Sequence, residues 1–165
     1  MKTARLAHLA ALSLLVAQGA ALAADTPPPP PPPAPTARPA APAAADPMAA
    51  ARSRLVSRQY GAAVEELKKV NATGSADWNN LMGYSLRKQA TPDLDGAQRH
   101  YDAALRIDPQ HKGALEYSGE LALMKNDMPT AEARLAALQR VCASGCEELD
   151  ELKKSVARVK AGGKP

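Results

Sequence analysis

The chain has 165 residues, 45% of them hydrophobic, and a formal net charge of +4 at pH 7. Once residues 1–47 are set aside, 18 basic and 15 acidic residues remain, and the length suffices for one small domain. This excess of positive charge is too small to predict a nucleic-acid partner, and no basic run is accompanied by aromatic side chains that could stack on bases.

Residues 1–23 have the pattern of a secretory signal peptide. Lys2 and Arg5 precede an apolar run at 6–16, and small residues follow, so we expect cleavage after Ala23. A membrane anchor is the alternative, but the run is shorter than the roughly 18 apolar residues that a span needs. The pattern predicts an exported protein without a stable membrane span, periplasmic in a Gram-negative host, with secretion as the second choice.

Residues 24–47 form a low-complexity segment of proline and alanine with an unbroken run at Pro27–Pro33. Such a composition makes neither helix nor sheet, and we expect a disordered, extended linker. A ligand for a proline-recognising domain is the alternative, but low-complexity composition rarely specifies a partner by itself.

From residue 48 onward the sequence predicts short amphipathic helices in pairs. The chain contains no phenylalanine and one tryptophan, and helices pack the remaining small and medium apolar side chains closely. The expected hairpins comprise 48–57 with 60–70, two helices within 78–109, and 110–124 with 130–141. In the central hairpin we expect Asp77 and Thr91 to be the N-caps and Pro109 to follow the end of the second helix.

A last helix is expected at about 147–160, since Ser144 and Glu147 form an S-x-x-E capping box. Its apolar stripe would cover one end of a helical stack. Residues 161–165 are expected to be a flexible tail.

The hairpins repeat with a period of 34 residues. Each second helix has a small residue, a large one a turn later, and then a small or medium one. These positions are Ala63, Leu67 and Val70, then Ala97, Tyr101 and Ala104, then Ala131, Leu135 and Leu138. Gly83 and Gly119 occupy the matching place in the preceding helices, where a missing side chain would let a neighbouring helix approach.

Together with Trp78 and Pro109, these residues resemble the tetratricopeptide repeat (TPR) family. The resemblance covers about residues 48–141 and implies an all-α fold. The expected domain, 48–160, is a right-handed stack of three TPR-like hairpins with a C-terminal capping helix. The stretch 141–152 is similar to the end of small secreted TPR proteins of proteobacteria, which implies an exported location and no particular activity. TPR domains are general binding scaffolds, so the resemblance names no partner.

Cys142 and Cys146 lie close together before the last helix. In an oxidising compartment the simplest interpretation is a disulfide that attaches this helix to the stack. A redox-active or metal-binding thiol pair is the alternative, because a cysteine near a helix N-terminus has a lowered pKa. The spacing is not that of a CxxC motif, and no histidine is near in the sequence.

No constellation in the sequence suggests catalysis. His8 lies in the signal peptide, and His100 and His111 have no nucleophile or ligand set at a suitable spacing. There is no glycine-rich phosphate loop. We therefore expect no enzyme, no cofactor and no metal.

The remaining candidate is a surface. In TPR stacks the first helix of each hairpin lines a concave groove, and helical turns counted from Gly83 and Gly119 predict its residues. They are Asn80, Tyr84, Arg87, Lys88, Glu116, Glu120 and Leu123. The basic and amide groups could bind a carboxylate or backbone carbonyls of a peptide, and the two glutamates could bind a basic residue. Each residue could equally be an ordinary solvated one.

The sequence therefore predicts an exported scaffold that binds a peptide or protein segment in its groove. A structural component of the cell envelope, formed by self-assembly or cell-wall association, is the alternative. A thiol-redox or metal-binding protein is a third possibility.

Overall fold

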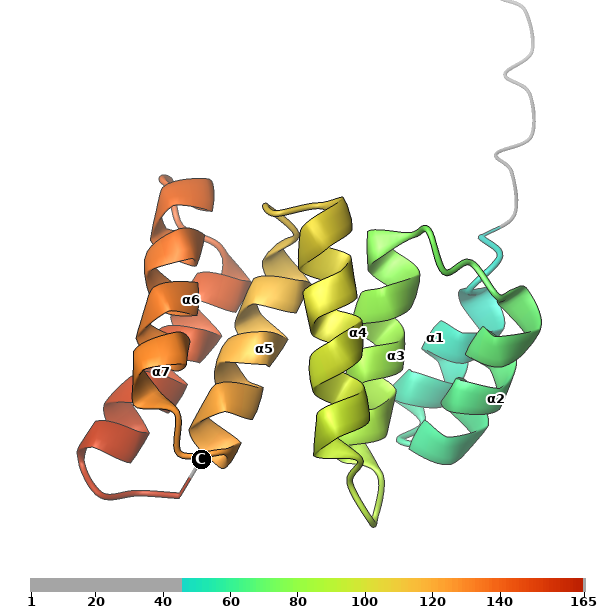
Figure 1. Ribbon diagram of the computed structural model, residues 1–165, viewed down its shortest axis with the longest axis horizontal. Coiled ribbons are helices and arrows are strands. Elements are labelled where there is room, and N and C mark those ends of the chain that lie inside the picture. Colours follow the sequence, from blue (N-terminus) through green and yellow to red (C-terminus); the bar gives the residue numbers. More distant parts are fainter. Residues whose placement is uncertain (1–45, 165) are drawn as a thin grey trace, which may run out of the picture. The chain divides into compact units, whose positions relative to one another are not determined.

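The computed structural model describes residues 46–164, and within them the protein is all-α, as the sequence predicts. This part of the chain contains seven helices and no strand (Figure 1). The helices are α1 (Ala49–Val56), α2 (Tyr60–Val70), α3 (Ala76–Lys88), α4 (Leu94–Ile107), α5 (Lys112–Met124), α6 (Met128–Val141) and α7 (Glu147–Lys160). The expected signal peptide and the proline-rich segment up to residue 45 lie outside the described residues.

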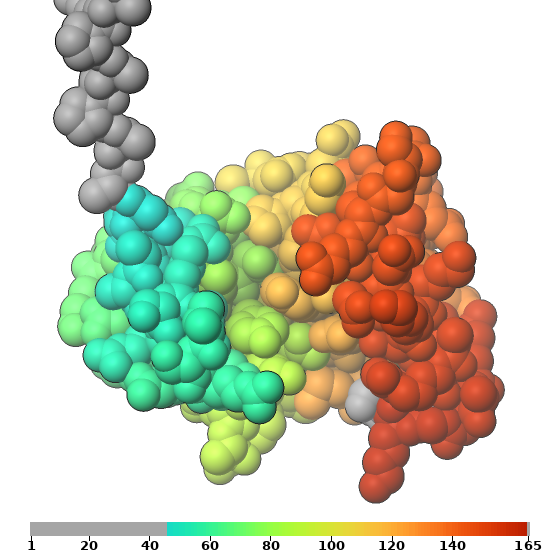
Figure 2. Space-filling view, turned by 180° about the vertical axis from the view of Figure 1, so that it is seen from behind, coloured from blue at the N-terminus to red at the C-terminus, as the bar shows by residue number. Residues whose placement is uncertain are grey.

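Successive helices pack against one another in the order of the chain. The pairs α1–α2, α3–α4 and α5–α6 are in contact, and they are connected through α2–α3, α4–α5 and α6–α7. Further contacts between α3 and α5 and between α5 and α7 join alternate helices. The helices therefore form a row from α1 and α2 to α6 and α7 (Figure 1), and the face that carries α1 and α7 is turned to the viewer in Figure 2.

The core contains most of the repeated positions. The residues with no exposed surface include Ala63, Leu67, Ala97, Tyr101, Ala104, Ala131 and Leu138. Val70 and Leu135 are only half-buried and pack at the edge of the two larger clusters. In the cluster formed by α1, α2 and α3, the indole N–H of Trp78 donates to the carbonyl oxygen of Leu67 at 2.8 Å. This bond satisfies the one polar group of a large buried side chain and connects α3 to α2.

Two predicted helix starts are displaced. The N-cap of α4 is Asp93 and not Thr91, because the Asp93 carboxylate accepts a hydrogen bond from the backbone N–H of Gly96 at 2.7 Å. The N-cap of α3 is Ser75 and not Asp77, and its hydroxyl accepts from the N–H of Trp78 at 3.2 Å. In each helix the N-cap is the residue whose side chain can reach the backbone N–H of the N3 residue, three positions later.

The last helix covers the end of the row. Leu152 and Val156 of α7 are buried in a cluster with α5 and α6 that also contains Cys142. The sulfur atoms of Cys142 and Cys146 lie at disulfide distance, with their Cα atoms 5.7 Å apart. The predicted capping box is wrong: the N-cap of α7 is Cys146, two residues after Ser144, and no side chain caps it.

Two glycines permit close helix packing, as the repeat pattern predicts. A Cβ atom at Gly83 would lie 2.7 Å from Cε1 of Tyr101, and one at Gly119 would lie 2.7 Å from Cδ2 of Leu152. Both distances are shorter than a normal carbon–carbon contact. The rings and side chains of α4 and α7 therefore occupy the space that a side chain on α3 or α5 would need.

We predict that Gly83→Ala lowers the free energy of unfolding by roughly 1–3 kcal/mol, because overpacking displaces the Tyr101 ring. Gly61→Ala is the matched control, since Gly61 is an exposed helical residue with no atom within 4 Å of the added Cβ. The control variant should be neutral or more stable by up to about 1 kcal/mol. Urea denaturation followed by circular dichroism measures both, and equal effects of the two substitutions would contradict the packing explanation.

Candidate binding groove

Two cavities lie on the side of the row formed by α1, α3, α5 and α7. One, which we name the arginine pocket, has a volume of about 510 Å³ and is lined by Arg87, Lys88, Glu120, Leu123, Met124, Ser155 and Arg158. The other, the tyrosine pocket, has a volume of about 440 Å³ and is lined by Arg52, Leu55, Val56, Asn80, Leu81, Tyr84, His111, Gly113, Glu116, Tyr117 and Glu148. We refer to the two pockets together as the groove.

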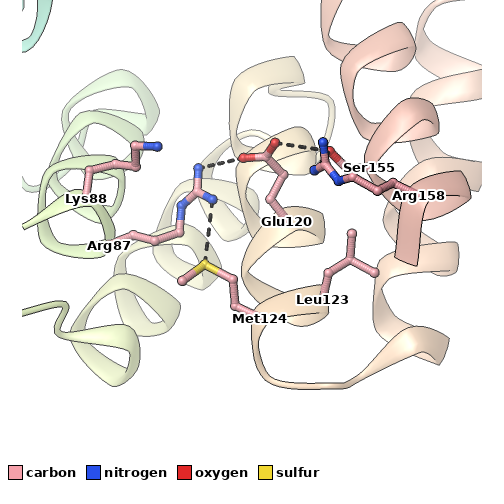
Figure 3. Close-up of a pocket in the computed structure, with 7 residues that line it drawn as sticks. All are labelled: Arg87, Lys88, Glu120, Leu123, Met124, Ser155 and Arg158. Carbon is pink, nitrogen blue, oxygen red and sulfur yellow. Dashed lines mark hydrogen bonds and ion pairs between the residues drawn. The ribbon is translucent and has the colours of Figure 1, made fainter. Parts of the chain in front are cut away.

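The arginine pocket is built around an ion pair between α3 and α5 (Figure 3). Nη2 of Arg87 lies 2.7 Å from Oε2 of Glu120, and only 5% of the Arg87 side chain is exposed. On the other side, the Ser155 hydroxyl donates to Oε1 of Glu120 at 3.5 Å and accepts from Nη2 of Arg158 at 3.3 Å. Polar contacts therefore connect α3, α5 and α7 across the floor of this pocket.

The four tyrosines of the chain are close together beside this ion pair. The ring centroids of Tyr84 and Tyr117 are 4.8 Å apart. The Tyr60 centroid lies 6.1 Å from that of Tyr84, and the Tyr101 centroid lies 6.4 Å from that of Tyr117. The Arg87 guanidinium carbon lies 5.7 Å from the Tyr84 centroid and 5.6 Å from the Tyr117 centroid, within cation–π range. The two pockets therefore adjoin at Arg87.

Burial also shifts the acid–base properties of this region. It raises the pKa of Glu116 from 4.5 to about 8, and repulsion from Glu120 and Glu148 adds to the shift. Burial raises the pKa of Tyr84 and Tyr117 as well. The tyrosines therefore stay neutral, and Glu116 is largely protonated at neutral pH when nothing is bound.

All seven residues predicted for the groove line one of the two pockets. Asn80, Tyr84 and Glu116 line the tyrosine pocket, and Arg87, Lys88, Glu120 and Leu123 line the arginine pocket. Their exposure differs widely, however. Lys88 is exposed, whereas Leu123 is 2% exposed and belongs to the core.

Arg87 does not present a free charge to a ligand. Its guanidinium is buried and paired with Glu120, because α5 brings that carboxylate against α3. Sequence counting gave each helix face separately and could not show that these two predicted residues neutralise each other. It also missed Tyr117, Glu148, Ser155 and Arg158 of α5 and α7, although Tyr117 is adjacent in sequence to the predicted Glu116.

Among the described residues, the two histidines and the two cysteines do not form a joint site. His111 caps α5 by accepting from the N–H of Ala114, and its Nε2 lies 2.9 Å from Asp77. His100 contacts Asn79 and the Trp78 ring. Within residues 46–164, no group of three or more potential ligands could hold a metal ion, and no helix has the length and apolarity to cross a membrane.

The chain matches no protein-family model and no curated protein.

We predict that Arg87 and Glu120 are strongly coupled. Arg87→Met should lower the free energy of unfolding by roughly 2–4 kcal/mol, because it leaves a partly buried carboxylate without its partner. A double-mutant cycle with Glu120→Gln should give a coupling energy of about 1–3 kcal/mol. The exposed pair Glu65–Lys68, 2.8 Å apart, is the control, and its coupling should not exceed about 0.5 kcal/mol. Equal coupling in both pairs would contradict a structural role for the buried one.

We predict that Glu116 makes the folded protein less stable as the pH rises from 4.5 to about 8. Over that range the unfolded chain loses the Glu116 proton and the folded chain keeps it, so this group lowers stability by at most about 1.4 kcal/mol per pH unit. Glu116→Gln, which resembles the protonated carboxyl group, should flatten the curve. Urea denaturation at several pH values measures this effect, and Glu65→Gln should leave the slope unchanged. Parallel curves for wild type and Glu116→Gln would contradict the shifted pKa.

Proposed function

We propose that this protein is an exported TPR-like scaffold whose groove binds an extended peptide or a segment of another protein. In this proposal the three hairpins α1–α2, α3–α4 and α5–α6 form a right-handed TPR stack, and α7 is its cap. The 34-residue spacing of the buried alanines and the contacts of α3 with α5 and of α5 with α7 support this assignment.

The observation that carries the proposal is the pair of adjoining pockets on the side formed by α1, α3, α5 and α7. The Arg87–Glu120 pair holds the arginine pocket in place, and exposed groups stand at the edges of the two pockets. Val56, at 86% exposure, offers an apolar contact on α1, and Lys88 and Arg158 offer charged ones. A preformed surface of this kind binds a segment without first having to become ordered, which reduces the cost of association.

Export is proposed from the pattern in residues 1–23. The cysteine pair is compatible with an oxidising compartment, where disulfides persist. We propose the periplasm as the compartment if the source is a Gram-negative bacterium. An N-terminal sequence of the mature chain that begins at Ala24 would support this location, and an intact Met1 in the folded protein would contradict it.

Site-specific photo-cross-linking tests the groove. A photoreactive amino acid at Lys88, an exposed residue of the arginine pocket, should give cross-links to a protein partner in the cell that makes the full chain. The same amino acid at Arg106, an exposed residue of α4 that lines neither pocket, should not. Mass spectrometry of the cross-linked species identifies what is bound.

Each outcome has a distinct meaning. Cross-links from Lys88 alone support binding in the groove, and cross-links from Arg106 alone place the interface elsewhere and contradict it. Cross-links that contain only a second copy of this chain favour the structural envelope component. Arg87 is unsuitable for this test, because its replacement would perturb folding.

A further inference from the structure

Two buried side chains of the tyrosine pocket, Asn80 and Glu116, form no hydrogen bond to another side chain within residues 46–164. Asn80 is 7% exposed, and its buried Oδ1 has no hydrogen-bond partner among the described residues. Glu116 is 8% exposed, and in residues 46–164 its carboxyl group forms no ion pair and no hydrogen bond to another side chain. Buried polar groups are usually paired, and an acceptor left alone is costly. The buried acceptor without a partner is Asn80 Oδ1. A positively charged donor in this pocket would satisfy it and would pair with the Glu116 carboxylate.

Arg52 and His111, which line the same pocket, are already paired with carboxylates elsewhere. Arg52 is paired with Asp46 at 3.0 Å and with Asp77 at 3.4 Å, and His111 lies 2.9 Å from the same Asp77. Asp46 and Asp77, the partners of Arg52 and His111, lie outside the pocket lining. Glu148, the second carboxylate of the lining, likewise has no ion pair within the described part of the chain. Neither carboxyl group of the lining, Glu116 or Glu148, therefore has a cationic partner, and Glu116 adds a negative charge once it loses its proton.

Aromatic surface completes the pocket. Tyr84 and Tyr117 are both half-buried, and their rings lie 4.8 Å apart at the boundary with the arginine pocket. Arg87 already lies over both rings, and Lys88 lies over Tyr84. The rings therefore offer a ligand chiefly apolar surface, on which the alkyl part of a lysine or arginine side chain packs well. Leu55 and Leu81 add apolar lining.

We infer that the tyrosine pocket binds a basic side chain, an alkylammonium or a guanidinium group, of the segment held in the groove. Glu116 and Asn80 accept its hydrogen bonds, Glu148 contributes charge, and Tyr84 and Tyr117 contact its alkyl stem. This inference rests on the proposed function, because it names the chemistry of the segment that the groove binds. The arginine pocket has the opposite character, since Lys88 and Arg158 outnumber its single carboxylate, which Arg87 already neutralises.

Binding of a cation should be coupled to loss of a proton from Glu116. The groups that act on Glu116 are Glu120 on the same helix, Arg87 on α3, and Glu148 and Glu151 on α7. Arg52 and His111 share the pocket with it. A bound cation favours the ionised carboxylate, so affinity should increase as the pH rises toward the Glu116 pKa of about 8 and then level off.

The test is an NMR titration of the protein with n-butylammonium, which reproduces the end of a lysine side chain, and with n-propylguanidinium for arginine. The neutral analogue 1-butanol is the control ligand, and sodium chloride keeps the ionic strength constant. Saturable shifts of the Asn80 side-chain amide and the Tyr84 and Tyr117 rings are expected with a cation, at a dissociation constant on the order of millimolar for so small a ligand. 1-Butanol should produce no saturable shift.

Glu116→Gln should weaken binding of the cation about tenfold at pH 9 and remove its pH dependence, because the charged acceptor is lost. Glu65→Gln on α2, also a Glu-to-Gln change but far from the pocket lining, should leave affinity within about twofold of wild type. Tyr84→Leu is a second variant, at a half-buried position, and should weaken binding without abolishing it.

Absence of saturable shifts in the wild type, or equal affinity in wild type and Glu116→Gln, would overturn the inference. Shifts with only one of the two cations support it and identify the side chain. The result is separable from the proposed function. Cross-links from Lys88 without a cation site would mean that the groove binds a segment through other chemical groups. A cation site without cross-links from Lys88 would support cation binding by the tyrosine pocket and contradict the proposed scaffold function.

Discussion

The ion pair between Arg87 and Glu120 lies where α3, α5 and α7 meet, and the groove is built around it. Its two charged atoms are 2.7 Å apart, and the arginine is almost fully buried. Burying charges is expensive unless they are paired and hydrogen-bonded. Here the cost is offset by the pairing, by Ser155 and by the faces of two tyrosine rings. The helices must therefore keep their relative positions, because a small displacement would leave a buried charge without its partner.

This pairing also determines which charges are free to act on a ligand. With Arg87 and Glu120 neutralising each other, the exposed groups of the arginine pocket are Lys88 and Arg158. In the adjoining tyrosine pocket, the carboxyl groups of Glu116 and Glu148 have no cationic partner among the described residues. In the proposed scaffold, such unlike ends would let the groove distinguish the two directions of an extended segment, which an even distribution of charge could not do.

Much of the fold could be predicted from the sequence because the relevant signals are local. A buried stripe on a helix recurs every three or four residues, and a repeated hairpin recurs at a constant spacing. For this reason Ala97, Tyr101 and Ala104 were placed correctly in the core, and Gly83 and Gly119 correctly at close contacts. The same counting placed all seven groove residues at the pockets, since residues on one face of a helix keep that face in the folded protein.

The sequence by itself thus determined the all-α class, the hairpin spacing and the faces that meet. Only the tertiary structure decided the state of the residues on those faces. The pairing of Arg87 with Glu120 joins α3 to α5, and the contact of His111 with Asp77 joins the start of α5 to α3. The raised pKa of Glu116 results chiefly from its burial in the packed structure. Charge, burial and pKa depend on distances between atoms in space. Residues 33 or 34 positions apart, as in these two pairs, reach those distances only when their helices are packed.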